Sequence, residues 1–239
     1  MPRYPILTYH QIAEAPPKGA PYRSLYVAPG AFARQMRLLD LLGFRGLSMS
    51  ALLPYLRGEK VGRVVGITFD DGYTNNLENA LPVLQKLGFS STCYAVSGLV
   101  GRTNLWDLEV GIAQTGLMSA ELMRRWLAGG QEIGAHTQSH ARLDQLAEEQ
   151  SQVEILGSKV DLESLLGVAV NHFCYPYGGH GSIQVSQVKA AGFATATTTE
   201  RGRANAASPL FELPRVPVLR STTLPVFVLK LLSTYEDRK

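Results

Sequence analysis

The sequence has few cysteines and no long apolar run, and these absences exclude two broad classes of protein. Only two of the 239 residues are cysteines. Cys93 and Cys174 each lie in an apolar, strand-like run, so a small fold held together by disulfides is excluded and both are interpreted as buried apolar residues. A membrane-spanning helix needs about 20 apolar residues. The run 224–229 falls short, because it contains Pro225 and is followed by Lys230, and we expect no membrane span.

An excess of charge of one sign is also lacking. The chain has 23 Lys and Arg against 20 Asp and Glu, a formal net charge of +3, and its basic residues are scattered. Nucleic-acid-binding proteins usually carry a basic stripe or patch, so we expect no nucleic-acid partner. The sequence gives no signal for an oligomeric state.

The beginning of the chain lacks the charged region, apolar core and cleavage site of an export signal. We therefore expect a cytoplasmic protein, or an extracytoplasmic one if a leader has been trimmed from this sequence.

A regular rhythm of helix and strand signals runs through the chain. Amphipathic segments such as 32–42 and 77–87 each end at a glycine followed by phenylalanine, and the strand-like run 92–96 comes after the second of them. Seven strands that alternate with helices predict an α/β fold with a parallel, barrel-like sheet. The predicted strands are 6–9, 64–69, 92–96, 132–135, 172–175, 193–197 and 215–218. Because the loops after parallel barrel strands converge on one mouth, we expect the chemistry at the strand ends.

Two adjacent carboxylates, Asp70 and Asp71, directly follow the predicted strand 64–69. A turn at Gly72 would let the two side chains diverge from one centre and take different roles. The alternative is that one of them caps the following helix.

A pair of histidines, His136 and His140, follows the predicted strand 132–135. The spacing places both imidazoles on one face if the segment turns helically. Two imidazoles and one carboxylate form a three-ligand site with an open position, which suits Zn²⁺ and similar divalent ions. A structural role for both histidines is the alternative.

A third polar cluster, 176–180, follows the strand 172–175 and contains two glycines. Glycines let a backbone approach a ligand closely, and its amides would suit an oxyanion hole. A simple tight turn is the alternative.

Together the three clusters read TFDDGY at 68–73, HTQSH at 136–140 and YPYG at 175–178. In this order they resemble the motifs of the polysaccharide deacetylase family, also called the NodB-homology family or family 4 carbohydrate esterases. The resemblance covers about residues 5–218. It implies a distorted (β/α)7 barrel, with parallel strands and outer helices, and we expect one such domain over residues 1–239.

The resemblance also implies a division of labour among these residues. Asp71, His136 and His140 would bind a divalent metal, which we expect to be Zn²⁺, with Co, Ni, Mn or Fe as alternatives. Asp70 would be the general base that activates water. The backbone amide of Tyr177 would stabilise the oxyanion beside the metal.

Two departures from the family pattern stand out. The third family motif usually begins with an arginine that orients the base, but Cys174 holds this position here. The late Leu-x-His motif that supplies the general acid has no match, since no histidine follows His180.

Both gaps have candidate replacements that resemble the circularly permuted branch acting on poly-N-acetylglucosamine. There an early Tyr-His supplies the acid, which matches Tyr9-His10, and a late Leu-Pro-Arg matches 213–215. We therefore expect His10 to be the acid and Arg215 the partner of Asp70. The alternatives are a solvated loop histidine and a surface or sheet-edge cation.

The substrate is expected to contact Tyr73, Trp106 and Pro176. Trp106 and Asp107 lie in the segment 101–118, which fits neither the helical nor the strand period and is expected to be an ordered insertion. An aromatic face there would stack on a sugar ring, and simple packing of the insertion is the alternative.

The sequence thus predicts a metal-dependent hydrolase that removes N-acetyl groups from an N-acetylated sugar or polysaccharide and releases acetate. One alternative is a hydrolase of another non-peptide C–N bond, in a non-carbohydrate amide. The other is a catalytically silent glycan-binding module, which would be expected to have lost Asp70 or a metal ligand.

Overall fold

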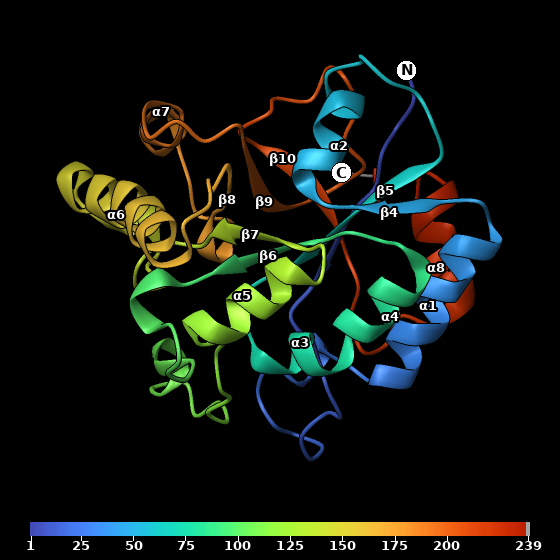
Figure 1. Ribbon diagram of the computed structural model, residues 1–239, viewed down its shortest axis with the longest axis horizontal. Coiled ribbons are helices and arrows are strands. Elements are labelled where there is room, and N and C mark those ends of the chain that lie inside the picture. The colour runs from blue at the N-terminus through green and yellow to red at the C-terminus, as the bar shows by residue number, and fades with distance from the viewer. Residues whose placement is uncertain (238–239) are drawn as a thin grey trace.

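The seven predicted strands form one closed ring in the computed structural model, which describes residues 1–237 (Figure 1). Every neighbouring pair in the ring is parallel, so the prediction of a distorted (β/α)7 barrel is confirmed. The ring contains, in order, β1 (Ile6–Tyr9), β5 (Val64–Phe69), β6 (Thr92–Ala95), β7 (Glu132–Ala135), β8 (His172–Cys174), β9 (Thr195–Arg201) and β10 (Leu213–Pro217).

The first strand closes the barrel. β1 pairs with β5 on one side, in the register Thr8 to Thr68, and with β10 on the other, where Leu7 lies opposite Val216. A register shift between Leu213 and Arg215 interrupts the pairing of β10 with β9. Within residues 1–237, three short strands lie outside the ring. β4 (Arg45–Leu47) pairs with the beginning of β5, and β2 (Gln11–Ile12) pairs with β3 (Tyr26–Val27).

Helices surround the ring, and some of them differ from the sequence expectation. The predicted segment 77–87 is two helices, α3 and α4, because the chain bends at Ala80 and Pro82 occupies the first turn of α4. The run 224–229 does form a helix, since Pro225 also lies in a first turn, where no N–H is needed. The helices are α1 (Pro29–Leu41), α2 (Met49–Leu56), α3 (Thr74–Asn79), α4 (Leu81–Leu87), α5 (Ala120–Ala128), α6 (Glu148–Leu166), α7 (Ser182–Ala190) and α8 (Leu224–Leu232).

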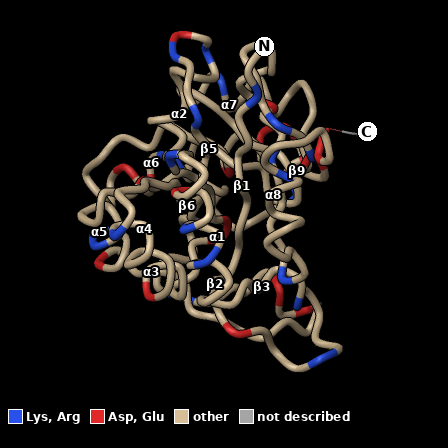
Figure 2. The backbone as a smooth tube through the Cα atoms, turned by 90° about the vertical axis from the view of Figure 1, so that its right-hand side faces the viewer, with Lys and Arg blue, Asp and Glu red and all other residues tan. Residues whose placement is uncertain are grey.

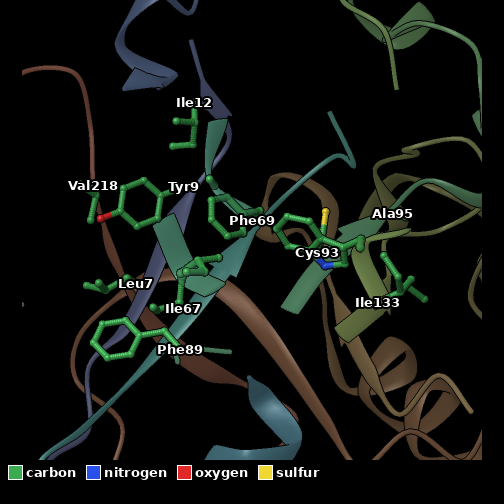
Figure 3. Close-up of a cluster of buried hydrophobic side chains, with 14 of the residues drawn as sticks. Leu7, Tyr9, Ile12, Ile67, Phe69, Phe89, Cys93, Ala95, Ile133 and Val218 are labelled. Carbon is green, nitrogen blue, oxygen red and sulfur yellow. The ribbon is translucent and has the colours of Figure 1, made fainter. Parts of the chain in front are cut away.

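Neighbouring residues on several strands, such as Ile6 and Leu7 of β1, belong to two separate apolar clusters. The larger cluster contains Leu7, Ile67, Cys93 and Ile133 from four neighbouring strands (Figure 3). Side chains of the outer helices, such as Phe32 of α1, belong to the same cluster. The opposite faces point into the barrel, as alternation in a closed sheet requires. Both cysteines are buried, as expected.

The barrel interior is filled from one end by α2. Met49, Leu52 and Leu56 of this helix cluster with inward-facing residues such as Ile6 and Tyr94. The backbone N–H of Met49 donates to Thr92 Oγ1, at 2.8 Å, where β6 begins. The other end of the barrel, where the strands finish, is therefore left for the polar clusters.

The described residues contain no helix long and apolar enough to cross a membrane. Lys and Arg positions are interspersed with Asp and Glu positions along the chain (Figure 2). This distribution agrees with the absence of a basic stripe in the sequence.

Candidate active site

The polar clusters meet at a cavity of about 260 Å³ at the ends of the strands. The cavity is lined by eight of the ten residues that the sequence singled out: His10, Asp70, Asp71, Tyr73, Trp106, His136, His140 and Tyr177. Arg215 lies behind Asp70, in the wall of an adjoining smaller pocket. Pro176 is buried at the start of a 3-10 helix, Pro176–Gly178, and is not among the lining residues of the cavity.

Three side chains converge in this cavity in a way that fits a divalent ion. Asp71 Oδ1 lies 3.5 Å from His136 Nε2 and 3.3 Å from His140 Nε2, and all three residues are buried. Two ligands at 2.0–2.2 Å from one ion in tetrahedral geometry are about 3.3–3.6 Å apart. The observed separations match this spacing, so the three side chains could hold such an ion.

Unusual backbone conformations bring these ligands together. Asp71 has a φ of 74° and the following Gly72 a φ of 83°, so the chain turns sharply after β5 and the two carboxylates diverge. The segment from His136 to His140 is a bend and not a helical turn, with φ of 64° at both Thr137 and His140. Neither carboxylate caps the next helix, whose N-cap is Tyr73 with no side-chain cap.

The bend between the two histidines is held by hydrogen bonds. Thr137 Oγ1 accepts from the backbone N–H of His140 at 2.9 Å, and Glu154 of α6 accepts from the backbone of Gln138 and Ser139. His136 Nδ1 lies 2.7 Å from the carbonyl oxygen of Cys174. A hydrogen bond there leaves Nε2 of His136 free to face Asp71.

Asp70 forms a bidentate ion pair with Arg215, at 2.7 and 2.8 Å. The other donors of the guanidinium reach the carbonyl of Thr198, Thr68 Oγ1 and Cys174 Sγ, so all five N–H groups have acceptors. Burial would raise the pKa of Asp70, but the charge and hydrogen bonds of Arg215 hold it below its ordinary value. Arg215 is 2% exposed, which rules out a surface cation.

His10 extends from the end of β1 toward the same carboxylate. Its Nε2 lies 3.9 Å from Asp70 Oδ2, and its side chain is 25% exposed. The carbonyl oxygen of His10 accepts a hydrogen bond from Asn76 Nδ2 at 2.9 Å, and Asn76 Oδ1 accepts from the backbone of Ile12. Asn76, a buried residue of α3, therefore fixes the loop that carries His10.

The charges of the site also shift the pKa values of Asp71 and His140. Burial would raise the pKa of Asp71, but hydrogen bonds from His136 and then His140 bring it well below its usual range. Burial lowers the pKa of His140. These directions favour an ionised Asp71 carboxylate and a neutral His140 imidazole, which are the forms that bind metals. Burial would lower the pKa of His136, but Cys174 and the hydrogen bond with Asp71 raise it well above its usual range, so a bound cation would have to displace a proton from this imidazole.

Tyr177 has a left-handed backbone, with a φ of 57°, and its ring packs edge-on against His140 with centroids 4.7 Å apart. The guanidinium carbon of Arg142 lies 4.2 Å from the centroid of the Tyr177 ring, in a cation–π contact. Burial raises the pKa of the Tyr177 hydroxyl to about 12.

Two features of the cavity were missed or left open by the sequence. Tyr22 lines it from the loop before α1 and Tyr26 lines it from β3, and no spacing or motif marks them. Asp107 is a third carboxylate in the wall, and Asn104 Nδ2 donates to it at 2.9 Å. Burial raises the pKa of Asp107.

Comparison with known proteins agrees with the motifs. Bacillus subtilis YxkH, named as a polysaccharide deacetylase, is 28% identical over 218 residues, which are 90% of this chain and 71% of YxkH. The poly-beta-1,6-N-acetyl-D-glucosamine N-deacetylase of Escherichia coli is 23% identical, over 96% of this chain but only 38% of that protein.

A solved structure, the Streptococcus pyogenes deacetylase PplD in complex with acetate, has a TM-score of 0.84 at 25% identity and covers 96% of this chain and 98% of PplD. IcaB from Ammonifex degensii shares the fold, with a TM-score of 0.79 at 23% identity, over 96% of this chain and 97% of IcaB. The sequence model of the polysaccharide deacetylases matches residues 57–196. The chain therefore belongs to the polysaccharide deacetylase family.

Proposed function

We propose that this chain removes N-acetyl groups from N-acetylglucosamine units of a polysaccharide or oligosaccharide, with a divalent metal as cofactor, and releases acetate. The observation that carries the proposal is the spacing of Asp71, His136 and His140 beside an ionised Asp70 in one cavity. Relatives from Escherichia coli and Staphylococcus aureus that match most of this chain are both named poly-beta-1,6-N-acetyl-D-glucosamine N-deacetylase, which supports the choice of substrate.

Asp71, His136 and His140 would hold the cation, and two imidazoles with one carboxylate suit Zn²⁺ while tolerating Co²⁺ or Ni²⁺. Such an ion supplies Lewis-acid chemistry at the amide carbonyl and makes a nearby water more acidic. The separations of 3.3 and 3.5 Å between the ligand atoms fit this assignment.

Asp70 takes the proton of the attacking water. Arg215 keeps this carboxylate ionised and fixes its plane through two parallel hydrogen bonds. The base is thereby ready to accept a proton at neutral pH without having to rotate.

His10 donates the proton that the departing amine needs. Its Nε2 is near Asp70, and its partial exposure gives it access to protons from solvent. The backbone N–H of Tyr177 donates to the carbonyl oxygen as negative charge develops there. Water thus adds to the acetyl carbon, the C–N bond breaks, and the products are acetate and a free amine.

Acetate release from N-acetylglucosamine oligomers tests the proposal. Chelation should abolish release and Zn²⁺ or Co²⁺ should restore it, while Asp70→Asn should remain inactive although it binds metal. Asp40→Asn, on the exposed side of α1, is the matched control and should retain full activity. If the metal-loaded protein releases no acetate from any oligomer, the substrate is not an N-acetylglucosamine chain.

A further inference from the structure

The two metal-site histidines are oriented by different means. The ring of His136 is anchored by its second nitrogen, because Nδ1 lies 2.7 Å from the carbonyl oxygen of Cys174. Metal-binding histidines usually have such a partner, which fixes the tautomer and the direction of the ring. His140 has none among the residues that the structure describes: its Nδ1 is buried and has no hydrogen-bond partner.

Aromatic packing surrounds His140 instead. The indole of Trp106 stacks on its face, with ring centroids 4.4 Å apart and planes inclined by 21°. Tyr177 and His136 pack against it at steep angles, with centroids at 4.7 and 4.9 Å. Stacked and edge-to-face contacts at these distances are favourable.

We propose that Trp106 is a positioning residue for His140, whose stacked indole holds the imidazole plane in the metal-binding orientation in place of the missing hydrogen bond. The proposal rests on the metal site proposed above. It gives Trp106 a role that does not require contact with the sugar.

The two constraints on the ring are complementary. The backbone of His140 is set by Thr137, whose hydroxyl accepts from its N–H, but the ring can still turn about its bond to Cβ. The stack on Trp106 removes orientations that tilt the plane out of the site. Within that plane, the charge of Asp71, 3.3 Å from Nε2, selects the nitrogen that faces the ion.

The position of Trp106 in the fold makes this role testable. It lies in a short 3-10 helix, Leu105–Asp107, within the insertion between β6 and α5, and is partly exposed. Asn104 holds this helix through Asp107 and through the backbone N–H of Thr115. Truncating the indole therefore removes a contact with His140 without opening the apolar core.

The test measures metal affinity in the absence of any sugar. Zn²⁺ binding to the metal-free 239-residue chain is titrated in competition with a chromophoric chelator, for wild type, Trp106→Leu and Trp106→Phe. We expect Trp106→Leu to weaken affinity by about 10-fold or more, because loss of the partner of a metal-binding histidine costs roughly 10–100-fold. Trp106→Phe keeps an aromatic face and should stay within about 3-fold of wild type.

Leu105→Ala, which removes a neighbouring exposed side chain from the same helix, is the matched control and should bind Zn²⁺ as wild type does. Thermal unfolding of the metal-free variants checks that Trp106→Leu is folded at the titration temperature. A variant that is unfolded there is replaced by Trp106→Met, for which the same loss is expected.

Each outcome separates the two proposals. Unchanged Zn²⁺ affinity in Trp106→Leu, together with a raised KM for the oligomer, would overturn the positioning role and assign Trp106 to sugar binding alone. An equal loss in Trp106→Phe would also overturn it, since stacking would then not be the cause. If wild type binds no divalent cation, both this inference and the proposed metal dependence are wrong.

Discussion

Breaking the Asp70–Arg215 pair from the arginine side should be one of the most destabilising single changes in the protein. Arg215→Met removes the cation and leaves the buried carboxylate of Asp70, 3% exposed, without its partner. Removing one member of a buried ion pair costs about 3–5 kcal/mol. For a chain of this size, 1 kcal/mol corresponds to about 2–4 °C in Tm, so we expect Tm to fall by about 6–20 °C.

The double variant Asp70→Asn/Arg215→Met carries the sharper expectation. Each single change leaves one uncompensated buried charge, but the double change leaves none. Its free energy of unfolding should therefore be no lower than that of either single variant, and the coupling energy should be about 3 kcal/mol or more. Arg215→Lys should fall between wild type and Arg215→Met, because three ammonium donors cannot reach the five acceptors of the guanidinium.

Equilibrium urea unfolding at pH 7, followed by far-UV circular dichroism in the presence of chelator, measures these energies without any contribution from bound metal. Arg220→Met, which removes an exposed arginine five residues further on, is the matched control and should change stability by no more than about 0.5 kcal/mol. A loss below 1 kcal/mol for Arg215→Met, or additive losses in the double variant, would refute the reasoning.

Three further predictions concern pH, backbone strain and metal. Burial would raise the pKa of Glu236, but its ion pairs with Arg201 and Lys230 lower it. This carboxylate therefore stabilises the fold above its unfolded pKa of about 4.3, and the stabilisation is lost as the pH falls through the lower pKa of the folded state. Glu236→Gln should cost about 1–3 kcal/mol at pH 7 and less at pH 3. Gly178→Ala should lower the free energy of unfolding by about 1–2 kcal/mol, because Gly178 has a φ of +77°. It should lose about 1–3 kcal/mol more, and activity with it, because a Cβ would lie 3.0 Å from the backbone nitrogen of Thr199. Free Zn²⁺ at 100 times its Kd should raise the free energy of unfolding by about 2.7 kcal/mol, and chelation should reverse the rise.

Each of these has a measurement and a control. Urea unfolding of Glu236→Gln at pH 7 and pH 3 tests the role of the Glu236 carboxylate. An equal loss of unfolding free energy at both pH values would contradict a role for its ionisation. Gly192 has a similar φ of +81°, but a Cβ there would meet no atom within 4 Å. Gly192→Ala is the control and should lose only about 1–2 kcal/mol, the cost of the positive φ. Thermal unfolding with and without Zn²⁺ tests the metal, and Asp71→Asn should lose the Zn²⁺-dependent rise; a rise of equal size in this variant would place the ion elsewhere.

Much of the fold could be predicted because its signals are local. All seven barrel strands were visible as apolar runs, and each lies within a few residues of its predicted position. The helices α2 and α8 were not predicted, because each contains a proline, Pro54 and Pro225, and proline usually signals a helix break in a sequence. The helix α5 was not predicted either. The break between α3 and α4 was also missed, since both halves fit a single helical period.

The residue types at the ends of β5, β7 and β8 could be read from the sequence, because each motif directly follows its strand. That Asp71 and the two histidines face one point could not, since a bend and not a helical turn separates His136 from His140.

The same holds for the residues around Asp70. Arg215 is 145 positions away in sequence, and it reaches the carboxylate because β1 closes the ring between β5 and β10. The stacking of Trp106 on His140 likewise depends on how an irregular insertion folds over the barrel mouth. A strand can be recognised from the apolar and polar residues of its own short segment. Barrel closure and loop packing depend instead on contacts between segments that are far apart in the chain.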